Sequence, residues 1–290
     1  GAVYKGSWKG LTVAVKTVVF TAHADSLNKP LMNEARAVLE AAVCLSLSHP
    51  NIVSTYHYDV KPVCHNEDDK MGLDVQNPAA LDNYWKLFLV LEYCHSSLGF
   101  AMQKGLFNRG GNSSFESVLY TLLDVAKGAL YLHQHQIIHG DIKPDNILLK
   151  ADATSRMGWT AKISDFGMST KLEPTASHAS NHRLGTPFYC APEVATDGHT
   201  TKASDVFSFG VVMSELCSGA PPFQKAQGDS NFEINPAFPY FPSYVPGALK
   251  DLALRCMDAN ISERPNFVEI VSSLQAMEES IVLAGSSGVK

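Results

Sequence analysis

The sequence predicts an α+β fold in two parts: a small antiparallel β-sheet part with one helix, and a larger, mainly helical part. Three observations predict it. Apolar residues alternate on both sides of the turn at Lys9-Gly10, which is typical of a β-hairpin. Apolar residues then recur at helical spacing over 30–47, and helical spacing dominates after a link near residue 94. With 290 residues and 45% hydrophobic content, the chain is long enough to bury a substantial core in each part.

The first part opens with the predicted hairpin, Val3 to Val15, and continues with the predicted helix, Pro30 to Leu47. Proline suits the first turn of a helix because the amide proton that it lacks would have no partner there. The segment His49-Pro50-Asn51 ends this helix.

Two more strands complete the first part. Residues Ile52 to Tyr58 form one predicted strand, and the continuous apolar run Leu87 to Leu91 forms a buried one. Between them, 61–83 is polar and irregular, which predicts a surface insertion.

The second part is predicted from four helical patterns. The helix with apolar residues over 118–130 has Ser114 as its candidate N-cap. The pattern over 206–216 is more uniformly apolar, which indicates a buried helix. Two further helices are predicted over 249–257 and 267–277.

Composition narrows the functional classes. The net charge of -6 argues against nucleic acid as the main partner, because phosphate backbones attract basic surfaces. The six cysteines form no close pair, so we expect reduced thiols in a cytoplasmic protein. No apolar run approaches the roughly 20 residues that span a bilayer. Because the chain begins at Gly1, inside a motif, we expect the parent protein to extend upstream. That upstream part could carry a membrane anchor.

The segment His139-Gly140-Asp141-Ile142-Lys143-Pro144-Asp145-Asn146 carries the most specific chemistry. Asp141 can accept or orient the proton of a substrate hydroxyl, Lys143 can neutralise a transferred phosphate, and Asn146 can hold a metal ion. The segment resembles the protein-kinase catalytic loop, H-R-D-x-K-x-x-N. The resemblance implies the two-lobed protein-kinase fold, with ATP and Mg²⁺ as cofactors and proteins that bear Ser or Thr as substrates.

Two further motifs follow in the order that this family shows. Asp165-Phe166-Gly167 resembles the kinase metal site, which implies that Asp165 joins Asn146 in holding Mg²⁺. Alone, this tripeptide is a common turn. More residues than usual separate Asp165 from Asp141 in the sequence, and we attribute the excess to a hairpin insertion at Asp152 to Gly158.

Gly185-Thr186-Pro187-Phe188-Tyr189-Cys190-Ala191-Pro192-Glu193 is similar to the peptide-receiving segment of Ser/Thr kinases. The resemblance implies that Thr186 hydrogen-bonds toward Asp141 and Lys143. It also implies a buried ion pair between Glu193 and Arg264. Asp205 resembles the buried aspartate that supports the catalytic-loop backbone, although Phe207 stands where the family usually has Trp.

The resemblance extends to the nucleotide. Lys16 would pair with the α- and β-phosphates, and Glu40 would pair with Lys16, with Glu34 as the second candidate. A solvated lysine and a solvated helix glutamate are the alternatives. The implied adenine site has apolar walls and backbone groups, and core packing is an equally compatible role for its apolar members. The residues concerned are Val3, Ala14, Leu91, Glu92, Cys94 and Leu148.

The sequence departs from the family at two places. Gly1-Ala2-Val3 supplies only the end of the glycine-rich phosphate loop, so we expect this chain to bind ATP more weakly than its parent. Gly140 replaces the arginine that ordinarily pairs with a phosphate on the activation segment. We therefore expect activity to depend little on phosphorylation of that segment, whose hydroxyls are Ser169, Thr170, Thr175, Ser177 and Ser180.

The expected domain covers 1–281, with a small lobe over 1–93, a large lobe over 94–281 and a tail over 282–290. Short motifs at both ends are most like those of the tyrosine-kinase-like group, whose members are mostly Ser/Thr kinases. Two alternatives stay open at this point. One is a pseudokinase scaffold, and the other is a small-molecule phosphotransferase, since some of those enzymes also carry His-Gly-Asp.

Overall fold

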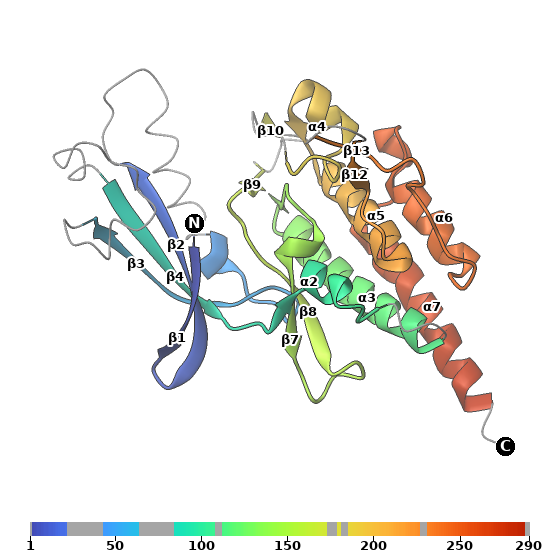
Figure 1. Cartoon of the computed structure of the whole chain (residues 1–290), viewed down its shortest axis with the longest axis horizontal. Helices are drawn as coiled ribbons and strands as arrows, with labels where there is room; N and C mark the ends of the chain where they lie inside the picture. Colours follow the sequence, from blue (N-terminus) through green and yellow to red (C-terminus); the bar gives the residue numbers. More distant parts are fainter. Residues whose placement is uncertain are drawn as a thin grey trace. The chain divides into compact units, whose positions relative to one another are not determined.

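The computed structural model describes residues 2–21, 43–63, 84–107, 112–172, 179–180, 185–226 and 231–287. The chain divides into two compact units, Gly1–Cys94 and His95–Lys290, and each is described by itself. The fold is mixed α+β, with an antiparallel sheet in the first unit and mainly helices in the second (Figure 1).

The N-terminal unit is built on a four-stranded antiparallel sheet in the order β1-β2-β4-β3. The predicted hairpin is confirmed, and its turn residues Lys9 and Gly10 have φ values of 49° and 80°. Such positive φ values match the right-handed twist of the paired strands. The predicted strand at Ile52 begins three residues later, at Thr55. The bounds are β1 Ala2–Trp8, β2 Leu11–Thr21, β3 Thr55–Pro62 and β4 Tyr84–Glu92.

One face of this sheet carries the core of the unit. Phe20, Leu87 and Leu89 are buried together there. Lys16 lies directly opposite Leu89 in the β2–β4 pairing, so its side chain leaves the sheet on the same face. The strands therefore present one lysine among apolar neighbours.

Several predictions fall outside the described residues. These include Gly1, Glu34, Glu40 and most of the predicted helix over 30–47, of which the structure describes one helical turn at 43–46. Most of the predicted surface insertion, 64–83, is also outside them.

The C-terminal unit is organised around α3 (Asn112–Gln134), which packs against α7 (Phe267–Ser287) and α5 (Lys202–Ser218). Figure 1 shows these helices running alongside one another, with α6 (Gly247–Cys256) next to α5 and α7. All four helices were predicted, but α3 begins two residues before Ser114, which is therefore inside the helix rather than its N-cap. The helix α7 extends ten residues beyond Met277.

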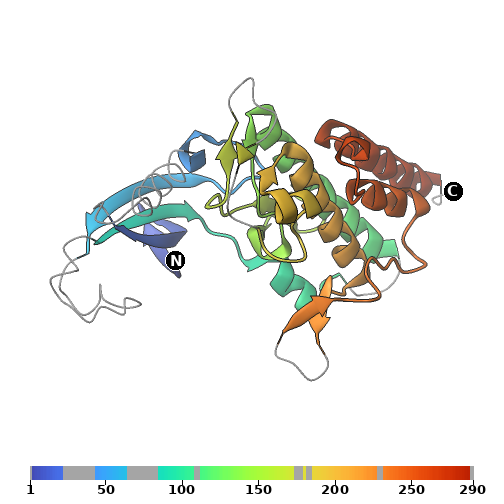
Figure 2. The ribbon, with the colours of Figure 1, turned by 90° about the horizontal axis from the view of Figure 1, so that it is seen from above.

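Short elements complete the unit, and most of them were not predicted. The helices α2 and α4 span Leu98–Gln103 and Pro192–Asp197. A three-stranded sheet contains β5 (Ser96–Ser97), β7 (Ile147–Ala151) and β8 (Trp159–Ile163). Residues 152–158 form the turn between β7 and β8, so a hairpin is present where one was predicted. In Figure 2 the hairpin of β12 (Phe223–Lys225) and β13 (Phe232–Ile234) projects away from the helices. The remaining pairs are β6 (Ile137–Ile138) with β9 (Thr170–Lys171), and β10 (Ala179–Ser180) with β11 (His199–Thr200).

Among the helices that the structure describes, none combines the length and the apolar composition that crossing a membrane requires.

Candidate active site

The carboxylate of Asp141 is held from several directions in the loop that follows β6. Its Oδ1 accepts hydrogen bonds from the backbone N–H of Thr186 at 3.1 Å and from the Thr186 hydroxyl at 2.7 Å. Its Oδ2 accepts one from Asn146 Nδ2 at 2.8 Å and lies 2.8 Å from Lys143 Nζ. The structure therefore brings the predicted residues of the catalytic loop together with the activation segment.

Thr186 joins two charged groups through one hydroxyl. Lys143 Nζ donates to Thr186 Oγ1 at 2.5 Å, and the same hydroxyl donates its proton to Asp141. This confirms the predicted contacts of Thr186. The neighbouring Gly185 permits the approach, because a Cβ atom there would lie 2.9 Å from the backbone oxygen of Gly140.

The loop backbone is anchored by Asp205 from the first turn of α5. Its Oδ2 accepts the N–H of His139 and its Oδ1 that of Gly140, both at 2.8 Å, as the sequence predicted. The third partner, His133 Nε2 at 2.9 Å, was not predicted. Asp205 is almost fully buried, so these three contacts replace the water that its carboxylate has lost.

Gly140 occupies a position at which a larger residue would be strained. Its φ is +77°, and a Cβ atom there would lie 3.0 Å from the backbone oxygen of Met168. Glycine adopts this left-handed conformation without steric cost. The departure from the usual arginine therefore relieves crowding between the catalytic loop and the segment after Phe166.

His139 connects the catalytic loop to the Asp165-Phe166-Gly167 segment. Its Nε2 lies 3.0 Å from the carbonyl oxygen of Ser164, and its Nδ1 accepts the N–H of Asp141 at 3.2 Å. One neutral tautomer, protonated at Nε2, makes both bonds. Its ring also packs edge-on against the buried ring of Phe166, with centroids 5.4 Å apart. The sequence motif named His139 but gave no hint of these partners.

Asp165 and Asn146 have the donor chemistry that Mg²⁺ requires. Asn146 Nδ2 is bound to the backbone oxygen and the side chain of Asp141, so its amide oxygen is the atom left for a metal. The Asp165 carboxylate is exposed, and its backbone has a left-handed φ of 63°. Carboxylate and amide oxygens are hard ligands, so the residues present fit a magnesium ion.

The ion pair predicted between Glu193 and Arg264 is confirmed. Arg264 Nη1 and Nη2 donate to the two carboxylate oxygens of Glu193 at 2.7 and 2.9 Å. The guanidinium also donates to the carbonyl oxygens of Asp258 and Ala203, and it lies over the ring of Phe207. Removing one partner of such a buried pair costs roughly 3–5 kcal/mol, because a charge is stranded.

A second buried pair was missed. The Tyr189 hydroxyl donates to Glu215 Oε2 at 2.6 Å, and both residues are buried. Burial raises the pKa of Glu215 from 4.5 to about 7, the Tyr189 hydrogen bond opposes this, and the Asp145 charge adds to it. Burial also raises the pKa of Tyr189. The available signal for this pair was a glutamate inside the mostly apolar pattern over 206–216.

In the N-terminal unit, strand pairing places several residues that are predicted to bind the nucleotide side by side. Ala14 lies opposite Leu91, and Val3 lies opposite Lys16. Glu92 is buried, and its side chain and backbone N–H both bond to the backbone of Ser54.

The other residues that are predicted to bind the nucleotide lie outside this strand pairing. Cys94, the last residue of the N-terminal unit, is partly exposed. Leu148 lies in β7 of the C-terminal unit. Gly1 and Glu40 lie outside the described part of the chain.

Comparison with known proteins agrees with this geometry. Residues 1–274 match the family described as protein kinase domain. The chain is 32% identical over 224 residues to the probable serine/threonine-protein kinase PBL18 of Arabidopsis thaliana, covering 70% of this chain and 55% of that protein. It is 28% identical to the Arabidopsis serine/threonine-protein kinase VIK (97% of this chain, 58% of that one). It is 29% identical to the Arabidopsis serine/threonine/tyrosine-protein kinase HT1 (96% and 64%).

The chain thus spans between 55% and 64% of the length of these relatives. The match over residues 1–274 and the order of the motifs around Asp141 lead to one conclusion. This chain belongs to the protein kinase domain family.

Proposed function

We propose that the chain is an ATP-dependent protein kinase that transfers the γ-phosphate of ATP to Ser and Thr hydroxyls of proteins in signalling. One observation carries this proposal: the Asp141 carboxylate is tied to the peptide-receiving segment through Thr186 while Lys143 lies 2.8 Å away. Phosphoryl transfer depends mainly on positioning and on electrostatic stabilisation, and this cluster offers both.

Each residue of the cluster has a proposed role. Asp141 orients the substrate hydroxyl and accepts its proton as the oxygen attacks. Lys143 neutralises negative charge on the phosphoryl group while it is being transferred. Thr186 helps to orient these two groups by bonding to both, and Asp205 holds the backbone of the loop that carries them.

ATP and Mg²⁺ are the proposed cofactors. Asn146 and Asp165 would hold Mg²⁺, which when bound neutralises phosphate charge. Lys16, with Glu40 as its partner, is proposed to contact the phosphates. The inward direction of Lys16, on the face shared with Leu89, supports this role. The residues proposed for the rest of the nucleotide are Gly1, Val3, Ala14, Leu91, Glu92, Cys94 and Leu148.

A transfer assay with radiolabelled ATP tests the proposal. Equal amounts of the chain receive a mixed protein substrate or a small amino alcohol, with Asp141→Asn as the background. We expect label on the protein, released as phosphoserine and phosphothreonine after acid hydrolysis. Label on the amino alcohol would instead indicate a small-molecule phosphotransferase. No label above the Asp141→Asn background would indicate a scaffold, and phosphotyrosine alone would contradict the proposed acceptor.

A further inference from the structure

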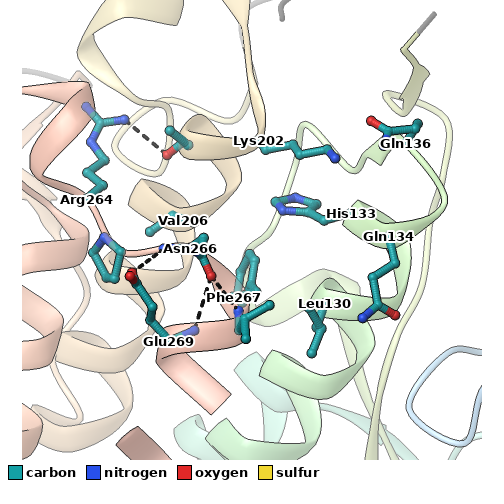
Figure 3. A pocket seen from close by; sticks show the side chains of 13 residues that line it. Leu130, His133, Gln134, Gln136, Lys202, Val206, Arg264, Asn266, Phe267 and Glu269 are labelled. Atoms are coloured by element: carbon teal, nitrogen blue, oxygen red, sulfur yellow. Dashed lines mark hydrogen bonds between the residues drawn. The ribbon is translucent and has the colours of Figure 1, made fainter. Parts of the chain in front are cut away.

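A pocket of about 600 Å³ lies in the C-terminal unit, and none of the residues proposed to act on ATP or on the substrate lines it. It is formed by the end of α3, the start of α5 and the segment that begins α7, and we call it the α3–α5–α7 pocket (Figure 3). Pockets that bind small molecules typically enclose about 300–1,000 Å³ and have mainly apolar walls. The size of this one is therefore sufficient for a ligand.

The walls are largely apolar. Val206 and Phe267 are almost fully buried, and Leu130 is partly exposed at the opening. The Phe267 ring meets the His133 ring edge-on, with centroids 5.0 Å apart. Figure 3 shows Leu130 and Phe267 on one side of the pocket. These walls favour an apolar or aromatic body in the ligand, because it would leave water on binding.

The charged side chains of the lining differ in how they are satisfied. Arg264 is paired with Glu193 through two hydrogen bonds. Glu269 accepts the backbone N–H of Asn266 and so helps to cap α7. The ammonium group of Lys202 forms no hydrogen bond or ion pair with any residue that the structure describes.

The Lys202 side chain is also partly buried, so its ammonium group has lost part of its water. Loss of water lowers the pKa of Lys202 below its ordinary value of 10.5. In Figure 3 its side chain extends toward His133 and Gln136, on the side away from Glu269. An anion beside Lys202 would restore the interaction that its ammonium group has lost.

We propose that the α3–α5–α7 pocket binds an apolar monocarboxylate, with the carboxylate on Lys202 and the body against Leu130, Val206 and Phe267. A single negative charge fits best, since the lining offers one unpaired cation and Glu269 would repel a second charge. The carboxyl oxygens can also accept from the amide of Gln136, which lies near the end of the Lys202 side chain in Figure 3.

The pocket shares a wall with the network that holds the catalytic loop. His133, in the lining, contacts Asp205 at 2.9 Å, and Asp205 accepts the N–H groups of His139 and Gly140. A bound carboxylate would thus be two side chains away from the loop that carries Asp141. Binding itself does not depend on the transfer reaction, so it can be tested separately.

The test uses 4-phenylbutyrate, with 4-phenylbutanol and 4-phenylbutylamine as probes of the same carbon skeleton and different charge. Binding to the whole chain is measured by isothermal titration calorimetry. We expect saturable 1:1 binding of the carboxylate, weaker binding of the alcohol and none of the amine. Because Lys202→Met removes a charge-assisted hydrogen bond, we expect it to weaken binding of 4-phenylbutyrate by about tenfold and to leave binding of 4-phenylbutanol unchanged.

Two further variants locate the site. Lys250→Met removes an exposed lysine on α6 outside the pocket and should leave all three titrations unchanged. Leu130→Trp fills the pocket from its opening and should abolish carboxylate binding, while circular dichroism and the unfolding midpoint show that the variant is folded. The proposal is overturned by absence of saturable binding, by equal binding to Lys202→Met and the wild type, or by undiminished binding to folded Leu130→Trp.

Discussion

At the scale of single residues, the Thr186 hydroxyl forms hydrogen bonds to two charged side chains of the proposed site. It accepts from Lys143 and donates to Asp141, so it adds a second link between two charged groups that also pair directly, with Lys143 Nζ 2.8 Å from Asp141 Oδ2. Hydrogen bonds to charged groups contribute about 1.5–3 kcal/mol each. If this second link matters only when phosphate is transferred, removing the hydroxyl lowers kcat and leaves the KM for ATP unchanged.

Thr186→Ala should therefore lower kcat by at least about tenfold. Thr186→Ser keeps the hydroxyl and should retain most of the rate. Steady-state kinetics on both variants checks this. Equal kcat values for the alanine and serine variants would show that the hydroxyl does not position the two charged groups.

How far the sequence predicts the site depends on how far apart the partners lie in the chain. Asp141, Lys143 and Asn146 lie within one short loop, so their shared role could be predicted from the motif. Pairs between distant elements were predicted only where the family resemblance named both partners, as for Glu193 and Arg264. The bond from His133 to Asp205 joins α3 to α5, and only packing of those helices brings it about.

At the scale of elements, periodicity predicted the helices whose apolar stripe meets the core and failed elsewhere. The last turns of α7 were missed because Val282 and Leu283 are exposed, so no buried stripe marks them. The β12–β13 hairpin has three-residue strands with no buried position, which removes the alternation that predicts strands. Contacts between Phe223 and Phe232, with centroids 5.3 Å apart, support the hairpin instead.

The packing of α5 on α6 leads to a prediction about Gly210. A Cβ atom there would lie 2.8 Å from both Cys256 Cβ and Met257 Cγ. Overpacking of a core typically costs about 1–3 kcal/mol, whereas alanine gains up to about 1 kcal/mol over glycine within a helix. Gly210→Ala should therefore lower the free energy of unfolding by about 1–2 kcal/mol, as measured by urea unfolding.

Gly247 provides the matched control for this substitution. It begins α6, and a Cβ atom there would meet nothing within 4 Å. Gly247→Ala should leave stability unchanged or raise it by up to about 1 kcal/mol. If both variants were equally stable, close contact between α5 and α6 at Gly210 would be refuted.

At the scale of the whole molecule, the buried Glu215 makes stability depend on pH. Its pKa is about 7 in the folded chain and 4.5 as its ordinary value, so the folded state holds a proton that the unfolded state releases. The free energy of unfolding contributed by this group is fully present below pH 4.5 and is lost as pH rises to about 7. The loss amounts to roughly 3–4 kcal/mol.

Glu215→Gln removes the titration while keeping an oxygen for the Tyr189 hydroxyl. Relative to this variant, the wild type should lose stability between pH 5 and pH 8. Urea unfolding at both pH values measures the difference. A difference between the two proteins that stays constant with pH would mean that Glu215 is not protonated in the folded state at pH 5.

The central claim, that Asp141 is where the phosphoryl acceptor is activated, is tested most directly by kcat at saturating ATP. Asp141→Asn is compared with Asp152→Asn, which changes a partly exposed aspartate in the β7–β8 turn. Loss of a general base typically costs a factor of about 10²–10⁴. The account predicts such a loss for Asp141→Asn, unchanged ATP affinity, and full activity for Asp152→Asn. Comparable rates in the two variants would contradict it.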